Sequence, residues 1–351
     1  MFRLLEVRGS FPPALVLLAV LCCGCARQPA EALRTASAPP VWPPPPEAAR
    51  IQYLYSITRP ADIGSATSLL GKVARAITGA RIAPQVVRPY GMCLAPGDIL
   101  YVADPGIQAV HRFDLKERRY DQIKKFGKQK FLSPIGVTMD STGRLFISDS
   151  LLRTIFVYSA QGEPEEQIGT EDQLLRPTGI AIHPLLERLY VVDTSGHSIQ
   201  VFDLAGTFLF TIGGRGTGEG AFNFPTAISI DSEGILYVND SLNYRVQAFD
   251  ADGRFLYLFG RQGDGMGEFS HPKGIALDSK GHLYVTDAIF DAVQIFDREG
   301  TLLLSFGEAG QDPGHFWMPS SIHIDATDRI FVADSYNQRI QVFRFLGGEG
   351  R

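Results

Sequence analysis

One unit recurs along most of the chain, and this repetition limits the possible folds more than any other feature. Each copy starts at a proline that opens an apolar segment, as in RPYGMCL and RPTGIAI. A second apolar segment follows, such as LYVAD or LYVND, and it always ends in aspartate. A period of this length indicates an array of supersecondary units. The prolines, 43 to 48 residues apart, are Pro89, Pro134, Pro177, Pro225, Pro272 and Pro319.

Each unit is predicted to form a small antiparallel sheet of four strands. The third apolar segment reads VHRFD or IQVFD, and the fourth, found in five copies, ends in glycine, as in FLYLFG. Short strands separated by Gly, Asp and Pro turns are typical of a propeller blade rather than of a helical solenoid. One blade cannot bury both faces of its sheet, whereas blades in a ring each pack on two neighbours. The sequence therefore predicts an all-β, six-bladed β-propeller.

The sixth unit lacks its fourth strand, because the chain ends soon after IQVFRF. The segment RIQYLYSI at residues 50–57 is similar to RFLYLFG at 254–260. We therefore expect residues 50–57 to be the outer strand of the last blade, within a propeller domain spanning 50–351. Pairing the two ends in this way closes the ring and leaves few strand edges exposed.

The units resemble NHL repeats in four features: the Pro-x-Gly start, the LYVxD strand, the DSxNxR turn at 240–245 and 334–339, and the FG ending. The resemblance covers residues 88–351 and implies a propeller of the NHL type. The first three copies lack the asparagine of the turn, which argues against six equivalent sites. Lipoprotein propellers of this type have no assigned chemistry as a family.

The N-terminus reads as a secretory signal. Arg3 and Arg8 precede the apolar run ALVLLAVLCC at 14–23, which is about half the length that spans a bilayer as a helix. The sequence LCCGC resembles a bacterial lipobox, in which Cys25 would be acylated after removal of residues 1–24. Cleavage by an ordinary signal peptidase is the alternative. Ala26, by the same resemblance, implies sorting to the outer membrane, and it excludes the haem-attachment motif, which needs histidine there.

Two further segments lie between the signal and the first repeat. Residues 25–49 are rich in Ala and Pro, with four consecutive prolines at 43–46, and predict a stiff tether. Residues 64–80 place Leu69, Leu70, Val73 and Ile77 at helical spacing. This predicts a short helix that covers one face of the ring, or alternatively one that lies on a membrane surface.

An aspartate ends the second strand of every unit and opens the following turn. Such side chains accept hydrogen bonds from turn amides, so we expect a structural role. Sixfold repetition supports this view, because a catalytic residue usually occurs once. Arg153, Arg245 and Arg339 follow in the same turns and are placed to pair with the carboxylates. The aspartates are Asp104, Asp149, Asp193, Asp240, Asp287 and Asp334.

The connections from the fourth strand of one unit to the first strand of the next should share a face with the aspartate turns. They are rich in glycine, but no strand–GxxxxGK[ST]–helix context exists, so a phosphate-binding loop is not indicated. Phe224, Met266, Phe316 and Trp317 lie in these connections. Aromatic and methionine side chains on loops above a rigid scaffold are typical of binding surfaces, so these four form the candidate binding face.

A metal site has little support. The seven histidines scatter over the repeat, and only His271, His315 and His323 lie near first strands, without a recognisable ligand spacing. No set of catalytic residues stands out, so no cofactor is expected, although a metal ion in the central channel is the alternative. The net charge of −5 argues against nucleic acid as a partner.

These observations favour a monomeric, non-enzymatic binding platform outside the cytoplasm. It would be anchored by lipid, in the outer membrane facing the periplasm, and would bind a protein or an envelope component on its loop face. The alternative is an enzyme, a metal-dependent lyase or lactonase with its site in the central channel. The enzyme requires a metal or an acid–base set at the channel, whereas the platform requires an exposed apolar patch on the loops.

Overall fold

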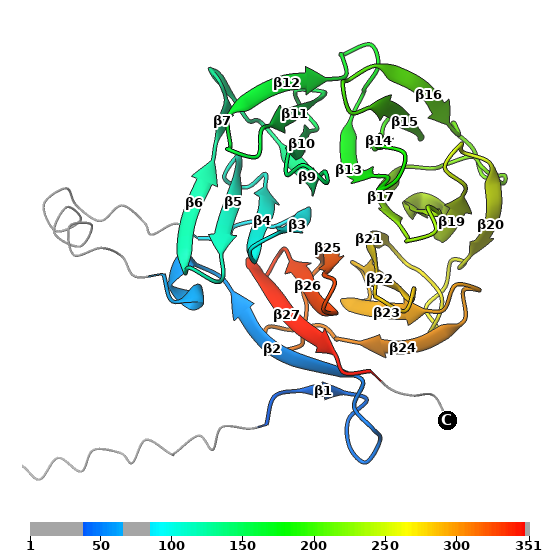
Figure 1. Cartoon of the computed structure of the whole chain (residues 1–351). Helices are drawn as coiled ribbons and strands as arrows, with labels where there is room; N and C mark the ends of the chain where they lie inside the picture. Colours follow the sequence, from blue (N-terminus) through cyan, green and yellow to red (C-terminus); the bar gives the residue numbers. More distant parts are fainter. Residues whose placement is uncertain (1–37, 66–84, 348–351) are drawn as a thin grey trace, which may run out of the picture. The chain divides into compact units, whose positions relative to one another are not determined.

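The computed structural model describes residues 38–65 and 85–347. Six sheets are arranged in a ring, each with its first strand at the centre and its fourth at the rim (Figure 1). The predicted six-bladed propeller is therefore confirmed. The predicted signal peptide, Cys25 and nearly all of the predicted helix at 64–80 lie outside the described residues. No helix in the described part of the chain is long and apolar enough to cross a membrane.

The strands follow the repeat in order from the centre to the rim. The innermost strands are β3 (Met92–Ala95), β9 (Pro134–Met139), β13 (Pro177–Ile182), β17 (Pro225–Ile230), β21 (Pro272–Leu277) and β25 (Pro319–Ile324). The second strands are β4 (Ile99–Asp104), β10 (Leu145–Asp149), β14 (Arg188–Asp193), β18 (Leu236–Asp240), β22 (Leu283–Asp287) and β26 (Arg329–Asp334). Blades 1 to 6 are numbered in this order.

The third strands are β5 (Ala109–Asp114), β11 (Thr154–Tyr158), β15 (Ser198–Asp203), β19 (Arg245–Phe249), β23 (Ala292–Phe296) and β27 (Arg339–Phe345). The outer strands are β6 (Arg119–Ile123), β12 (Pro164–Ile168), β16 (Phe208–Ile212), β20 (Phe255–Phe259), β24 (Leu302–Phe306) and β2 (Ile51–Ile57). A separate hairpin joins blades 1 and 2, formed by β7 (Lys125–Phe126) and β8 (Gln129–Lys130). Two short 3₁₀ turns are η1 (Pro60–Ile63) and η2 (Ser241–Asn243).

The ring closes by pairing the two ends of the described chain. Strand β2 is antiparallel to β27, with Ile51 opposite Phe345 and Ile57 opposite Ile340, as predicted for residues 50–57. A fifth strand, β1 (Val41–Trp42), pairs with β2, so this part of the predicted tether belongs to the last blade. The reason is apolar packing, because the Trp42 ring lies 5.7 Å from that of Phe306.

Adjacent blades are joined by apolar contacts and by hydroxyl groups. Each of six buried apolar clusters draws its residues from two neighbouring blades. Near the axis the innermost strands approach so closely that a Cβ on Gly136 would lie 2.3 Å from the carbonyl oxygen of Thr178. In the four units that have it, the glycine of the Pro-x-Gly start makes room for the neighbouring innermost strand. Hydroxyl groups also bridge blades, as where Thr226 Oγ1 donates to the Lys273 carbonyl at 2.9 Å.

Candidate binding surface and central channel

The aspartate turns and the connections between blades lie on the same face of the ring, as the sequence analysis predicted. We define the loop face as the turns between second and third strands plus the connections that enter each innermost strand. Backbone hydrogen bonds hold the two kinds of loop side by side, as where the Tyr336 amide donates to the Trp317 carbonyl at 3.2 Å. The loop face is therefore built in six similar sectors.

The six aspartates of the repeat lie at the base of this face. Each carboxylate accepts hydrogen bonds from backbone amides of the connection that enters its own blade. Asp149, for example, accepts from the Leu132 amide at 2.8 Å and from the Ser133 amide at 3.0 Å. These bonds fix the carboxylate and the backbone amides of the connection together. The aspartates therefore set the position of each connection relative to its blade.

Blade 1 has Ala109 at the position of the turn arginine, and a buried histidine two residues later contacts the aspartate instead. His111 Nε2 lies 3.1 Å from an Asp104 oxygen, and both side chains are almost fully buried. Burial raises the pKa of Asp104, but hydrogen bonds from His111 and from the Val87 and Arg88 amides outweigh it and hold the pKa below its usual value. The carboxylate is therefore ionised and already fully occupied by protein donors.

Blades 4 and 6 carry the predicted ion pairs. Arg245 Nε lies 2.8 Å from Asp240, and Arg339 Nε lies 2.7 Å from Asp334. The same guanidinium groups donate to backbone carbonyls of the entering connections, including Gly218 and His315. Arg153 forms no ion pair within residues 38–65 and 85–347. The arginines thus fasten long connections to two of the six blades.

A buried ring fills each of the three long connections, which are residues 213–224, 260–271 and 307–318. Phe316 is fully buried and packs over Gly307, whose φ is +91° and whose Cβ would lie 2.4 Å from the ring. The sequence prediction that Phe316 belongs to the binding face is therefore wrong. An aromatic residue on a loop gives no sign of burial unless its glycine partner, nine residues earlier, is recognised. The equivalent buried residues are Phe131, Leu174, Phe222 and Phe269.

Other apolar side chains of the loop face are exposed. Met266 is 77% exposed and Trp317 is 47% exposed, whereas Phe224 is partly covered by its contact with His197. The Trp317 and Tyr336 rings lie 5.6 Å apart. Among the described residues, the opposite face exposes Leu185, Leu186 and Leu346 as large apolar side chains. The exposed apolar set of the loop face is Leu132, Leu151, Leu175, Leu242, Met266, Ile289, Trp317 and Tyr336.

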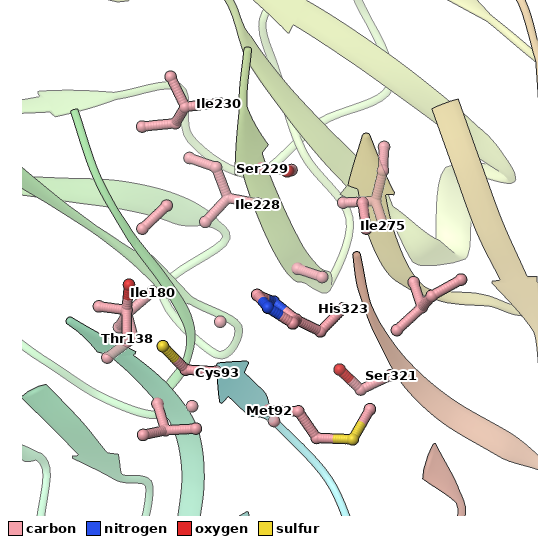
Figure 2. Close-up of a pocket in the computed structure, with 18 of the residues that line it drawn as sticks. Met92, Cys93, Thr138, Ile180, Ile228, Ser229, Ile230, Ile275, Ser321 and His323 are labelled. Carbon is pink, nitrogen blue, oxygen red and sulfur yellow. The ribbon is translucent and has the colours of Figure 1, made fainter. Parts of the chain in front are cut away.

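The six innermost strands surround a central cavity of ≈290 Å³. Its polar side chains are Cys93, Thr138, Ser229, Ser321 and His323, and most of the remaining lining is aliphatic or glycine. Figure 2 shows Cys93 and His323 pointing into this cavity from β3 and β25. His323 Nε2 accepts a hydrogen bond from the Leu94 amide at 3.2 Å, which fixes the proton on Nδ1.

Burial keeps both of these groups uncharged at neutral pH. It lowers the pKa of His323 to about 4 and raises the pKa of the Cys93 thiol to about 12. A neutral imidazole and a protonated thiol can donate hydrogen bonds, but neither carries charge that would hold an ion. The cavity therefore offers weak polarity inside an apolar wall.

Two family models match parts of the chain. One, described as NHL repeat, matches residues 316–343. The other, described as 6-bladed beta-propeller, matches residues 170–241 and 232–293. The chain is a six-bladed β-propeller with an NHL repeat. The first model covers the turn DSYNQR and the second covers the turn DSLNYR, and both turns were singled out by the repeat pattern.

Solved structures with the same fold come from bacteria. A Bacteroides thetaiotaomicron protein of unknown function has a TM-score of 0.62 and 16% identity, covering 75% of this chain and 70% of that one. Virginiamycin B lyase from Staphylococcus aureus, in an inactive form with quinupristin, has a TM-score of 0.57 and 13% identity, covering 76% and 98%. A gluconolactonase from Xanthomonas campestris has a TM-score of 0.58 and 16% identity, covering 83% and 98%. At these identities the likeness concerns the fold alone.

The donor groups of the propeller do not fit a catalytic metal in the channel. Such sites combine several His, Cys, Asp or Glu side chains, and the cavity lining contains one histidine, one protonated cysteine and no carboxylate. The three candidate histidines also lie in different places. His323 lines the cavity, whereas His315 pairs with Glu308 at 3.1 Å and His271 lies in the connection to blade 5. No group of three or more such side chains suited to a metal occurs among the described residues.

Proposed function

We propose that this propeller is a non-enzymatic binding platform whose loop face docks a protein or another component of the cell envelope. The observation that supports it best is the uneven distribution of exposed apolar side chains. Eight lie on the loop face, whereas the opposite face has three within the described residues. Exposed apolar groups gathered on one face of a soluble domain are typical of interaction sites.

The loops that carry these side chains are already fixed before a partner arrives. Buried phenylalanines fill the long connections, and carboxylates of the repeat bind their backbone amides. Binding therefore orders few additional groups, and the entropy cost of docking is small. A preformed surface of this kind suits a platform better than an enzyme, for which the channel lacks an acid–base set.

We further propose that the platform is held at a membrane by lipid on Cys25, outside the cytoplasm and on the periplasmic side of the outer membrane. This part rests on the sequence: the cationic start, the short apolar run, LCCGC and Ala26. In cells that make the full chain, Cys25→Ala should move the protein from the membrane fraction to the soluble fraction. Retention of this variant in the membrane fraction would overturn the lipid anchor.

Photo-crosslinking tests the docking face directly. A benzophenone amino acid is introduced at Met266 or at Trp317 of the full chain, and at Leu185 as a control. Met266 and Leu185 are both 77% exposed, so a benzophenone side chain is equally accessible at these positions on the two faces. We expect discrete crosslinked products from the two loop-face positions and none from Leu185. Equal patterns from all three positions would contradict the docking face.

A further inference from the structure

The connection from blade 1 to blade 2, together with strand β6 and the turn before it, is strongly basic. Between residues 116 and 130 the chain has seven cationic and two acidic side chains, although the whole chain carries a net charge of −5. Four of these cations belong to the β7–β8 hairpin and its flanks, where all are exposed: Lys124, Lys125, Lys128 and Lys130. This region is therefore basic, although the chain as a whole carries a net negative charge.

Three of these lysines line a cleft at the rim of the ring. Strand β7 lies between the outer strands β6 and β12 (Figure 1). The cleft has a volume of ≈780 Å³, and Lys124, Lys125 and Lys130 form part of its wall. The remaining wall contains no aspartate or glutamate. No ion pair with these three lysines is present among the residues that the structure describes, so their charges are available to a ligand.

The backbone of the hairpin, which carries the lysines, is held firmly. The Tyr158 hydroxyl donates to the Lys125 carbonyl at 2.8 Å, and the Phe131 amide donates to the Lys124 carbonyl at 3.2 Å. The Phe126 ring lies 5.0 Å from that of Phe156 in blade 2. A ligand would therefore meet a preformed cationic wall rather than a loop that it has to order.

The register of the hairpin is unfavourable without a ligand. Lys125 lies directly opposite Lys130 in the two-stranded ladder. Like charges at directly opposed positions destabilise a strand pair. A glutamate at either position would form a cross-strand ion pair and stabilise the hairpin. Two lysines at these positions are explained by an external anion that neutralises both.

We propose that this cleft, which we call the basic cleft, binds an acidic peptide segment of a partner protein. The site is concave, so it suits an inserted segment rather than a flat membrane. Ile107, Ile123 and Pro164 provide apolar contacts between the lysines, as a chain of alternating acidic and apolar residues requires. The aromatic side chains of the wall, Phe131 and Tyr158, are buried and cannot stack on bases, which disfavours nucleic acid. The inference depends on neither the lipid anchor nor the apolar loop face.

Fluorescence anisotropy on the full chain tests the proposal. The probe is a labelled octapeptide of alternating Glu and Ala, with a Gln–Ala octapeptide and an octathymidine as comparison probes. The variant Lys125→Gln/Lys130→Gln should weaken binding of the acidic peptide by about tenfold or more, because both charges face the cleft. The matched control is Lys116→Gln/Arg118→Gln, which removes the same charge from an exposed turn of blade 1 outside the cleft. It should change the affinity by less than about twofold at moderate salt.

Three results of these comparisons would overturn the basic cleft. One is equal weakening in the two double variants, which indicates only a long-range field. Another is equal binding of the Gln–Ala peptide, and a third is tighter binding of octathymidine than of the acidic peptide. A second variant, Lys130→Glu, guards against a folding defect. It should raise the midpoint of thermal unfolding and abolish peptide binding, and unchanged binding by this variant would also overturn the proposal.

Discussion

The connections that enter blades 5 and 6 have the same sequence pattern but are held by different contacts. In blade 6, Asn337 and Arg339 donate to carbonyls of the connection, including Gly310 and Gln311. The corresponding positions in blade 5 are Phe290 and Ala292, which have no such donors. One anchor is common to both, because Gln294 and Gln341 each bind one amide and one carbonyl of their connection.

The difference separates what a connection needs for folding from what it needs for rigidity. Both connections keep the glutamine and the buried phenylalanine, so these suffice to form the loop. In blade 5 a local contact replaces the missing anchors: Arg261 pairs with Glu268 at 2.8 Å, and both belong to the connection itself. The connection to blade 5 is thus tied to its blade by fewer bonds, and it carries Met266, the most exposed side chain of the apolar loop face.

The largest effect is expected from the contact that the two connections share. Phe269→Ala and Phe316→Ala should each lower the free energy of unfolding by about 3–5 kcal/mol, since each empties a fully buried site. Chemical denaturation measures both. Leu256→Ala, on an exposed outer strand, is the control and should cost well under about 1 kcal/mol. A loss at only one of the two phenylalanines would mean that the connections do not share this support.

The next effect distinguishes the two connections. Arg339→Met should lower the free energy of unfolding by about 3 kcal/mol, because it leaves the buried carboxylate of Asp334 without its cation. Burial already raises the pKa of Asp334. The matched change in the other connection, Arg261→Met, should leave the denaturation midpoint unchanged, because Arg261 is largely exposed. Equal losses would remove the distinction drawn between the two connections.

The sequence predicted the ring itself because each blade repeats the same local pattern. Period-2 apolar segments and the Asp, Gly and Pro turns gave the four strands, and the similarity of residues 50–57 to an outer strand gave the closure. Strand β1 was not predicted, because Val41 and Trp42 lie in a proline-rich segment whose packing partners are some 260 residues away or more. Local pattern carries no information about such a contact.

The candidate site was predicted less well, for two physical reasons. Exposure of a loop side chain depends on what packs beneath it, so Met266 and Trp317 are exposed whereas Phe316 is buried. The basic cleft was missed because the net charge of −5 averages over the whole chain. A count of charges per connection would have found the lysines, but their opposition across the hairpin required the register.

Transplanting the missing anchors is expected to have a smaller, local effect. In Phe290→Asn/Ala292→Arg, the new side chains can donate to carbonyls of residues 263–268, as their counterparts do in blades 4 and 6. Each added hydrogen bond contributes about 1 kcal/mol. Hydrogen exchange should therefore show increased protection of amides in residues 260–271 and unchanged protection in 307–318. Unchanged exchange in both would mean that other contacts set the mobility of the connection to blade 5.

The smallest effect concerns acid. Burial and the positive charge of Lys273 lower the pKa of His271, and Asp287 opposes them more weakly. As the pH falls below about 6.5, the unfolded chain gains a proton that folded His271 resists, so this residue makes stability decrease toward acid. The free energy of unfolding should therefore decrease less between pH 7.5 and pH 5.5 in His271→Gln than in the wild type. Ser270→Ala, which removes no titrating group, should keep the wild-type slope. Identical slopes in all three proteins would show that His271 titrates alike in the folded and unfolded chain, and that acid does not act on the connection to blade 5 through this residue.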